Sequence, residues 1–587
     1  MSGEVLRALW PYLRRYRGRL AGGLAILLVN TAVLVSIPYI IELAINDLGS
    51  GITTAKLLKY CLLLMGAVSA RAVLNYFQRL ILITVSRLIE YDLRNDLLAR
   101  LETLPGGFFQ KYRTGDLMAR AVNDLTAVRN MLGPGIMYSA QAVVLFAYVF
   151  TILWHLDPIL TLIAFIPAPF VSLAVQWFGK RIHDRFERIQ SMFSELATRV
   201  EENLSGLRLV RAYAREGIEE GKFDRLNRGY VDHNMRLVVL TGAFDPLLQL
   251  LLGVAFVLVL WFGGQAVLAH RINIGDYAAF NLYMAQMAFP MIALGYVINL
   301  VQRGTASLAR LQELLEQKPD IADGPRTDHR IAHLRGEIEF RDLTFAYDGG
   351  APVLRHLNLR IPAGSTVALV GATGSGKSTL VQLLPRLLDA TPGMVWMDGR
   401  PIGEIPLKVL RRSIGWVPQE TFLFSDTLRA NIAFGRPEAS DEQVRAAADV
   451  AGLSRDVAEF PSGYETLVGE RGLTLSGGQK QRTALARAVI RQAPILILDD
   501  ALASVDTITE ERILEGLESV AFHTGGARTT LLISHRISTV RNADFIAVLD
   551  EGRIGELGTH AELIGQGGIY ASLYEKQLLE EELARAD

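Results

Sequence analysis

The sequence predicts a multidomain membrane protein, in which an all-α domain of six membrane-spanning helices precedes an α/β domain. Two patterns indicate this. The first 310 residues contain long stretches without a charged side chain, whereas from Gly336 onward short apolar strands alternate with helical patterns. In addition, half of the 587 residues are hydrophobic and the mean hydropathy is positive, which is unusual for a soluble chain of this length.

Five charge-free stretches are each long enough to cross roughly 30 Å of hydrocarbon. They cover residues 21–41, 131–154, 158–179, 246–264 and 277–301. A sixth stretch, near residues 57–83, is interrupted by Arg71 and Arg79, but it has the required length and returns the chain to its starting side. A soluble domain would need an implausibly large core to bury so many apolar helices.

Basic residues predict the orientation of these spans. Four arginines precede the first span between residues 14 and 19, and more lie in the long connections near 94–129 and 180–236. Both termini are therefore expected in the cytosol, with segments such as 189–226 extending the spans as helices. No cleavable leader is visible, so we expect a multi-pass protein of the cell membrane, and a bacterial inner membrane suits the preference for Arg.

The composition changes after the last span. Residues 311–335 are polar and contain Pro and Gly, which predicts a transmembrane domain at 1–310, a linker at 311–335 and an α/β domain at 336–587. Strands are predicted near 338–340 and 366–370, and Asp398 followed by Gly399 predicts a tight turn.

Charge and cysteine content exclude two kinds of site. The formal net charge is -1 and the basic clusters lie beside apolar runs, so no nucleic-acid partner is expected. Cys61 is the single cysteine, which excludes an intrachain disulfide and a cysteine metal cluster.

Residues 366–379, TVALVGATGSGKST, read as an apolar strand, a glycine loop and the start of a helix. They fit G-x-x-x-x-G-K-[ST] at Gly371, Gly376, Lys377 and Ser378. In such a loop, backbone N–H groups surround phosphate oxygens, the lysine places its charge on the outer phosphates, and the serine hydroxyl is placed to ligate Mg²⁺. The remaining predicted nucleotide-binding residues of this loop are Thr373, Gly374, Ser375 and Thr379.

A second buried-strand pattern, residues 495–500 (ILILDD), ends in two carboxylates. Asp499 can hold Mg²⁺, and Asp500 can approach the water that attacks the γ-phosphate.

Residues 474–482, TLSGGQKQR, resemble the signature sequence of the ATP-binding cassette family. The resemblance extends over residues 336–575 and implies ATP and Mg²⁺ as ligands. It implies that Tyr347 stacks on adenine, that Gln419 in VPQE senses the γ-phosphate and Mg²⁺, and that His535 in ISHR is the switch histidine. Residues 468–472, VGERG, resemble the segment that exporters of this family place against the membrane domain.

The family closes the signature of one cassette over the phosphate loop of another. The resemblance therefore implies that Ser476, Gly477, Gly478 and Gln479 serve the ATP of a second half-transporter. In the membrane half, residues 108–130 and 199–215 resemble the two cytosolic excursions that carry coupling helices. The domain order resembles the exporter branch, which implies outward movement of amphipathic drugs, lipids or peptides.

Two positions depart from the family pattern. In the family, a glutamate usually follows the aspartate of the Walker B motif, which is Asp499 here, but this chain has Asp500 at that position. In the next segment, ALASVD, Ala503 stands where the family commonly has a serine. Asp is one methylene shorter, and a misplacement of about 1 Å can cost roughly 10²-fold in rate. The chain thus resembles the degenerate-site half of a heterodimer; a homodimer with a slow Asp base, and an ATP-gated channel or regulatory subunit, are the alternatives.

Polar side chains within the spans predict a substrate cavity, because buried polar groups in a membrane usually face a cavity or a partner helix. The candidates are Arg71, Asn75, Gln141, Asp245, Gln249, Asn281, Gln286 and Asn299, with Met284, Met287 and Met291 as adaptable apolar surface. Helix packing and snorkelling are the competing explanations for the same residues. Pro290 is expected to loosen the sixth span, because it removes a backbone hydrogen bond.

Overall fold

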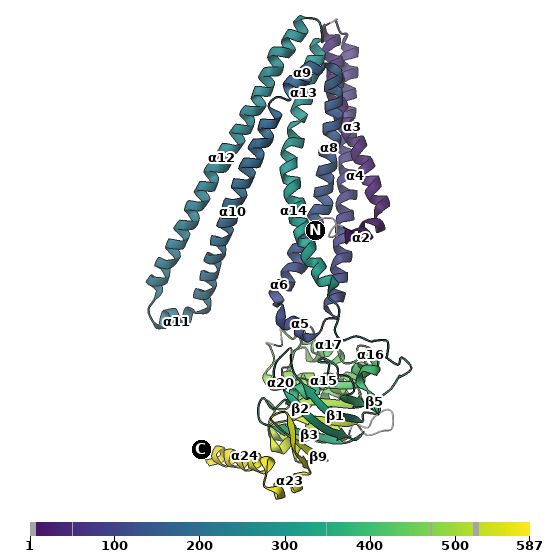
Figure 1. Ribbon diagram of the computed structural model, residues 1–587, viewed down its shortest axis with the longest axis vertical. Helices are drawn as coiled ribbons and strands as arrows, with labels where there is room; N and C mark the ends of the chain where they lie inside the picture. The colour runs from purple at the N-terminus through teal and green to yellow at the C-terminus, as the bar shows by residue number, and fades with distance from the viewer. Residues whose placement is uncertain are drawn as a thin grey trace. The chain divides into compact units, whose positions relative to one another are not determined.

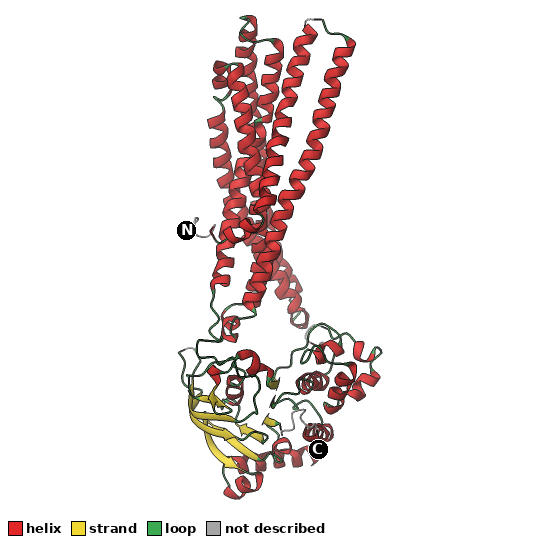
Figure 2. Ribbon diagram, turned by 90° about the vertical axis from the view of Figure 1, so that its right-hand side faces the viewer, coloured by secondary structure: helices red, strands yellow, loops and turns green. Residues whose placement is uncertain are grey.

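The computed structural model describes residues 7–49, 51–347, 349–469, 472, 474–519 and 528–586. The chain divides into two compact units. One comprises Met1–Thr103 and Tyr112–Gln317, and the other comprises Leu104–Lys111 and Lys318–Asp587. All of the described strands, yellow in Figure 2, belong to the second unit. This division agrees with the predicted fold class of a helical domain and an α/β domain.

The first unit consists of long helices joined by short turns (Figure 1). Helices α10 and α12 lie side by side and are linked through the short helix α11, while α3 packs against α4, α8 and α13. The bounds are α2 Trp10–Arg15, α3 Arg17–Gly49, α4 Thr54–Leu101, α6 Thr114–Ala119, η1 Arg120–Asp124, α7 Leu125–Asn130, η2 Met131–Gly135, α8 Ile136–Leu156, α9 Pro158–Ala164, α10 Ala168–Ser205, α11 Leu207–Ala212, α12 Glu216–Leu268, α13 Ile274–Gln286 and α14 Ala288–Glu316.

Among the described residues, five helical segments are long and apolar enough to cross a membrane. They are Arg17–Gly49, Thr54–Leu101, Thr114–Leu156, Pro158–Ser205 and Glu216–Leu268. Each contains one predicted span, including residues 57–83, where two arginines interrupt the apolar run.

The sixth predicted span, residues 277–301, is divided between α13 and α14, and the break falls at Met287. Proline has no N–H, so Pro290 cannot donate to the carbonyl of Gln286 four residues earlier. The helix is interrupted at Met287, one turn before the proline, although the Met287 N–H still donates to the Tyr283 carbonyl oxygen at 3.2 Å. The predicted loosening is therefore local.

Helix α14 continues to Glu316, so the first residues of the predicted linker, 311–316, are helical. Leu311 and Leu314 are buried in the first unit. An ion pair holds this helix end, because the Arg310 guanidinium donates to both carboxylate oxygens of the buried Asp124. Burial of the two leucines explains why a polar stretch of sequence remains helical.

The second unit contains two sheets and short helices. Its strands are β1 Ile338–Phe345, β2 Leu354–Ile361, β3 Thr366–Gly371, β4 Val395–Met397, β5 Arg400–Pro401, β6 Ile414–Val417, β7 Ile495–Asp499, β8 Thr529–Ile533, β9 Phe545–Asp550 and β10 Arg553–Gly558. Its helices are α5 Gly106–Lys111, α15 Lys377–Leu383, η3 Ile402–Glu404, α16 Leu407–Arg412, α17 Leu428–Ala433, α18 Asp441–Val450, α19 Ser454–Glu459, η4 Gly463–Glu465, α20 Gly477–Val489, α21 Thr507–Ser519, α22 Ile537–Val540, α23 His560–Gln566 and α24 Ile569–Ala586.

Four predicted local features, three strands and one turn, are confirmed in this unit. Residues 338–340 lie in β1, residues 366–370 lie in β3, and the apolar run before the two carboxylates is β7. Asp398 and Gly399 join β4 to β5 with φ angles of 50° and 74°. Two positive φ angles in a two-residue loop are typical of a type I′ hairpin turn.

The larger sheet aligns the ends of its strands. Its order is β10-β9-β3-β8-β7-β6, with β9, β3, β8, β7 and β6 parallel and β10 antiparallel. Ile533 of β8 pairs with Leu369 of β3 and with Asp499 of β7, and Val417 of β6 pairs with Leu498. The segments that follow these four strands therefore emerge at one edge of the sheet, where ligands of open parallel sheets bind.

Two apolar cores hold this edge in place. One lies between the large sheet and the four-stranded antiparallel sheet β2-β1-β4-β5, and includes Phe340, Leu369 and Leu531. The other packs α17, α18 and α20 on β6 and β7, with Leu485 of α20 and Leu498 of β7 both buried. Helix α20, which begins in the signature sequence, is thereby fixed to the strand that ends in Asp499.

Candidate nucleotide-binding site

A cavity of about 170 Å³ lies at this edge of the sheet. It brings together most of the predicted nucleotide-binding and catalytic residues from segments far apart in the sequence. The lining residues are Val353, Thr373, Gly374, Gly376, Lys377, Ser378, Thr379, Gln419, Asp499, Asp500, Ile533 and His535. The apolar wall made by Val353 and Ile533 was not predicted, since nothing in the sequence distinguishes these two residues from other core positions.

Two glycines of the phosphate loop are required by its geometry. A Cβ atom on Gly371 would lie 2.2 Å from the Leu549 carbonyl oxygen, so no side chain fits there. Gly376, which precedes α15, has a φ of 102° and lies against Leu354. Glycine adopts such a conformation at little cost, and the loop can therefore turn its backbone N–H groups toward the cavity.

Lys377 is 6% exposed, and all three hydrogen bonds of its ammonium group go to uncharged oxygens. Nζ donates to the Gly371 and Ala372 carbonyl oxygens at 2.9 Å each and to Ser375 Oγ at 3.4 Å. Burial lowers the pKa of this lysine, although Asp499 and Asp500 counter that effect. A buried ammonium without a direct anionic partner fits a site whose ligand carries negative charge, as a triphosphate does.

Asp499 is 3% exposed, and burial raises the pKa of its carboxyl group. Ser378 Oγ donates to Asp499 Oδ1 at 3.1 Å, and Gln419 lines the same cavity. Mg²⁺ is usually held by one or two protein oxygens together with phosphates and waters, so this sparse oxygen set fits the ion. Within the described part of the chain, no group of three or more His, Cys, Asp or Glu side chains could hold a metal without such a ligand.

Asp500 follows β7 in a left-handed conformation with a φ of 50°. Its backbone N–H donates to the Ile533 carbonyl oxygen at 2.9 Å, which fixes the residue to the end of β8. Asp tolerates this conformation better than most residues. Asp500 and His535 both line the cavity, as the predicted base and the predicted switch histidine would have to.

Tyr347, the predicted adenine-stacking residue, does not line the cavity. Its hydroxyl lies 3.0 Å from Thr379 Oγ1, and its ring is edge-on to Phe345 with 5.2 Å between the centroids. The residue is 41% exposed. Stacking on adenine stays a prediction.

None of the four predicted signature residues lines this cavity. Ser476 caps α20, where its N–H donates to Gln479 Oε1 at 3.0 Å and its Oγ accepts from the Gln479 N–H at 3.3 Å. Gln479 Nε2 also donates to Asp456 Oδ1, at 3.1 Å. Ser476 and Gly477 are exposed on the surface of the unit. In the segment 468–472, Glu470 and Arg471 lie outside the described residues.

None of the polar residues predicted for a substrate cavity lines a pocket of about 610 Å³ in the first unit. This pocket is lined by Ala32, Val35, Ser36, Tyr39, Glu42, Tyr148, Thr151, Ile152, His155, Leu156 and Tyr283. Arg71, Asn75, Asp245 and Asn299 are exposed in the single chain. The substrate role of these residues stays a prediction.

Three of the remaining candidates bond to helix backbone or to one another. Asn281 donates to the Tyr277 carbonyl oxygen at 2.9 Å, Gln286 donates to that of Leu34 at 3.5 Å, and Gln249 donates to Asp245 at 3.0 Å. Gln141 and Met284 are half-buried, and Met287 is buried at the helix break. A buried polar pair that was not predicted joins α3 to α4, where Asn30 Nδ2 donates to Gln78 Oε1 at 2.7 Å.

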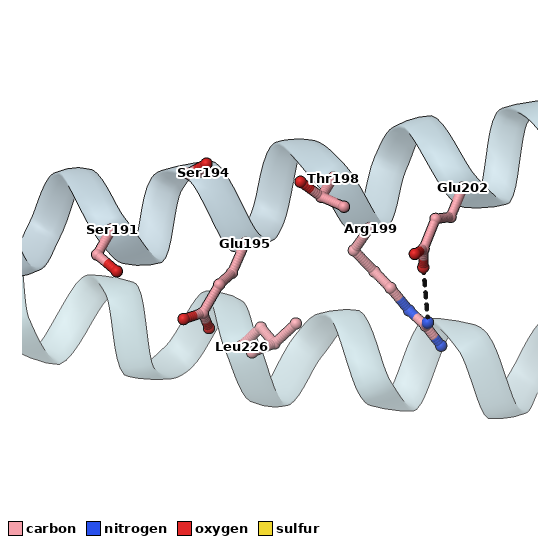
Figure 3. A pocket seen from close by; sticks show the side chains of 7 residues that line it. All are labelled: Ser191, Ser194, Glu195, Thr198, Arg199, Glu202 and Leu226. Carbon is pink, nitrogen blue, oxygen red and sulfur yellow. Dashed lines mark hydrogen bonds and ion pairs between the residues drawn. The ribbon is translucent and has the colours of Figure 1, made fainter. Parts of the chain in front are cut away.

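A polar groove of about 320 Å³ lies between α10 and α12 (Figure 3). Six polar or charged residues of α10 and Leu226 of α12 line it: Ser191, Ser194, Glu195, Thr198, Arg199 and Glu202. Arg199 pairs with Glu202 at 3.2 Å and also with Glu219. The charge of Arg199 is therefore compensated by these two carboxylates, and the groove contains no residue of the predicted nucleotide site.

Comparison with known proteins agrees with both halves of this description. The family model "ABC transporter transmembrane region" matches residues 20–291, and the model "ABC transporter" matches residues 354–503. A probable multidrug resistance ABC transporter ATP-binding/permease protein of Bacillus subtilis, YheI, is 36% identical over 98% of each chain. An ATP-dependent lipid A-core flippase of Syntrophus aciditrophicus is 34% identical, over 100% of this chain and 97% of the flippase.

A solved structure shares the architecture. A bacterial Atm1-family ABC exporter with ATP bound has a TM-score of 0.79 and 28% sequence identity, and the match covers 96% of this chain and 98% of the exporter. These relatives, matched over nearly their whole length, show the family, and the exporter shares the fold of this chain. The chain therefore belongs to the ABC transporter family, as an exporter-type, multi-pass membrane protein with an ATP-binding cassette on the same polypeptide.

Proposed function

We propose that this chain is one half of an ATP-driven exporter of amphipathic substrates, and that its own ATP site is the slower of two. One observation carries the proposal: the cavity contains the phosphate loop, Asp499 and Asp500, but no signature residue. Ser476 and Gly477 are instead exposed elsewhere on the same unit. A second cassette, whose signature closes over this cavity, completes the site, consistent with the dimers that exporters of this family form.

In the proposed site, the residues that line the cavity act on the phosphates and on Mg²⁺, while Tyr347, outside the cavity, acts on the base. Lys377 and the loop N–H groups bind the phosphates, while Ser378, Gln419 and Asp499 hold Mg²⁺. When bound, Mg²⁺ neutralises the charge that develops on the phosphate oxygens. His535 contacts the γ-phosphate from the end of β8, and Tyr347 stacks on the adenine.

Asp500 is the proposed base that orients the attacking water. Its carboxylate is one methylene shorter than a glutamate at the same position, and a displacement of about 1 Å can cost roughly 10²-fold in rate. This chain's Walker motifs therefore bind ATP but hydrolyse it slowly. Its signature, in contrast, matches the family pattern and completes a faster site on a partner that supplies a glutamate.

The proposed cargo and orientation follow from the membrane half. Relatives include a probable multidrug resistance transporter and a lipid A-core flippase, which supports a substrate class of drugs, lipids or peptides moved outward. The distribution of basic residues supports cytosolic termini, and the bacterial relatives support an inner membrane. The coupling segments 108–130 and 199–215 transmit closure of the cassettes to the spans.

The ATPase rate of the chain purified alone, and again after co-expression with its genomic neighbour, tests the proposal. We expect turnover to appear only with the partner. Vigorous turnover of the chain alone, abolished by Lys377→Ala, would instead mean a homodimer in which Asp500 is an adequate base.

A second assay separates transport from gating. Vesicles that contain the complex should accumulate a fluorescent amphipathic dye in an ATP-dependent manner. Passive ion current without ATP-dependent accumulation would contradict the exporter and favour an ATP-gated channel.

A further inference from the structure

The segment after β7, residues 500–506, is held by side chains from two sides. Gln481, in the signature helix α20, accepts from the Ser504 N–H at 2.9 Å, and its amide also lies 3.5 Å from the Asp500 carbonyl oxygen. From the other side, the Arg536 guanidinium donates to the carbonyl oxygens of Ala503 and Val505, at 2.8 Å each. Bonds to backbone fix the path of this segment whatever side chains it carries.

The guanidinium of Arg536 is itself fixed in orientation. It donates to Glu510 Oε2 at 3.0 Å, and this carboxylate is 2% exposed and also accepts from the Thr539 hydroxyl. The Arg536 N–H donates to Ser534 Oγ at 3.0 Å. A planar guanidinium oriented by a buried carboxylate can donate hydrogen bonds to two carbonyl oxygens in a fixed geometry, which the ammonium group of a lysine cannot do.

The held segment touches the signature on its other face. Ser504 faces Gly477 and Gly478, and a Cβ atom on Gly478 would lie 2.9 Å from the Ser504 carbonyl oxygen. A side chain at position 478 would therefore collide with the Ser504 backbone, and the glycine lets the two segments approach closely. Since Arg536 directly follows His535, this contact path connects the cavity of this chain to the exposed start of α20.

We propose that Arg536 and Gln481 are positioning residues that couple this chain's own ATP site to the signature that serves the partner's ATP. The inference rests on the proposed function, because the signature must act on a second chain. Arg536 moves with His535, and Gln481 moves with α20. Together they transmit a change at Asp500 and His535 to Ser476, Gly477 and Gly478 through the backbone of residues 503–505.

The test uses the complex of this chain with its co-expressed partner and the variant Arg536→Lys. Lysine keeps a positive charge beside Glu510 but loses the two-carbonyl contact. We expect kcat for ATP to fall about 10-fold with KM within about 2-fold, as for an interaction made only in the transition state. Photolabelling of this chain by an azido-ATP probe should be unchanged, because no group that contacts its own nucleotide is altered.

The matched control is Arg541→Ala. Arg541 is one turn away and makes only an exposed ion pair with Glu511 at 3.7 Å, so its loss should change neither kcat nor the melting temperature. An unchanged kcat in Arg536→Lys overturns the proposal. The proposal is also overturned if azido-ATP labelling or the melting temperature falls together with kcat in this variant. Arg536 would then act through folding or through nucleotide binding at this chain's own ATP site.

A second variant tests the other side of the contact path. Gln481→Met keeps the length of the side chain but removes both of its hydrogen bonds, and we expect the same change in kcat without a change in labelling. Combined with Arg536→Lys, its effect should be less than additive, whereas two independent packing defects would add.

Failure of this inference can be distinguished from failure of the proposed function. If the chain alone proves to be an active homodimer, the slow-half proposal is wrong, but the same kcat and KM comparison in that homodimer still tests Arg536.

Discussion

The two units of this protein differ in how their predicted functional residues are arranged. In the cassette unit, Gly374, Gln419, Asp499 and His535 come from four segments spread over more than 100 residues of sequence, yet all four line one cavity. In the helical unit, none of the eight predicted polar residues lines the pocket of about 610 Å³. The aligned ends of a parallel sheet bring functional residues together at one edge, whereas the packing of spanning helices does not by itself bring polar residues together.

The physical cause is the register of the elements. Parallel strands with paired ends deliver their following residues to one edge, and the pairing of Ile533 with both Leu369 and Asp499 sets that edge here. A residue on a helix faces a direction set by its position every 3.6 residues and by the rotation of that helix against its neighbours. Polarity alone therefore does not indicate which side of a span a residue faces.

The largest expected effect tests the cassette side of this comparison. Lys377→Ala removes the ammonium group that faces the cavity, and we expect a loss of about 100-fold or more in ATPase rate of the assembled complex, as for other charge-stabilising donors. Lys408→Ala, an exposed lysine of α16, is the control and should retain the normal rate. Equal ATPase rates in the two variants would contradict the assignment of this cavity as the ATP-binding site.

The next effect concerns the departure at Asp500. Asp500→Glu should raise the ATPase rate of the complex, by up to about 10²-fold at this site if the missing methylene limits the reaction. Asp500→Asn keeps the size and the tolerance for a positive φ but removes the carboxylate, so its rate should fall. No rise with glutamate would mean that another feature, such as Ala503, limits this site.

A smaller effect tests the helical unit with two residues of the same helix. Gln78→Ala leaves Asn30 buried without its partner and should cost about 1–3 kcal/mol of stability. Asn75→Ala, at an exposed position, should change stability by less than about 0.5 kcal/mol. Thermal unfolding in detergent measures both, and a larger loss for Asn75 would mean that this side chain has a buried partner in the assembled protein.

The smallest effect is the pH dependence of Asp499. Burial raises the pKa of Asp499 in the folded state, so ionising this carboxyl destabilises the fold. Below the pKa of the unfolded chain the carboxyl is protonated in both states and the destabilisation is absent. The destabilisation develops as the pH rises through the raised pKa of the folded state. Without nucleotide, the melting temperature of Asp499→Asn should therefore be higher than that of the wild type near pH 7.5 and about equal to it near pH 4. Each 1 kcal/mol of difference in the free energy of unfolding should shift the melting temperature by roughly 2–4 °C. Mg²⁺ with ATP should stabilise the wild type and have less effect on the variant. A variant that melts lower at pH 7.5 would contradict the burial argument.

Much of the fold could be predicted because its signals are local. Charge-free runs predict the spans regardless of their neighbours, and the strands β1, β3 and β7 follow from short apolar segments. The extension of α14 to Glu316 could not be predicted from polarity. It depends on burial of Leu311 and Leu314 in the first unit, which is a tertiary contact.

The division of the last predicted span is an intermediate case. The sequence shows Pro290 and hence the missing N–H, but the break at Met287 requires that the surrounding helices accept a separate α13. Tyr283, buried at the end of α13, donates to the Val35 carbonyl oxygen of α3 at 3.0 Å and holds that piece in place.

By itself, the sequence determined the chemistry of the phosphate loop, because Gly371, Gly376, Lys377 and Ser378 are contiguous and their geometry is set within a few residues. Only the tertiary structure decided what surrounds that loop. Strand register brings Asp499, Gln419 and His535 to it and keeps the signature on another surface, and the contacts of Gln481 and Arg536 join residues 55 positions apart through the backbone of a third segment. Such contacts depend on packing between elements, and no local pattern in the sequence encodes their register.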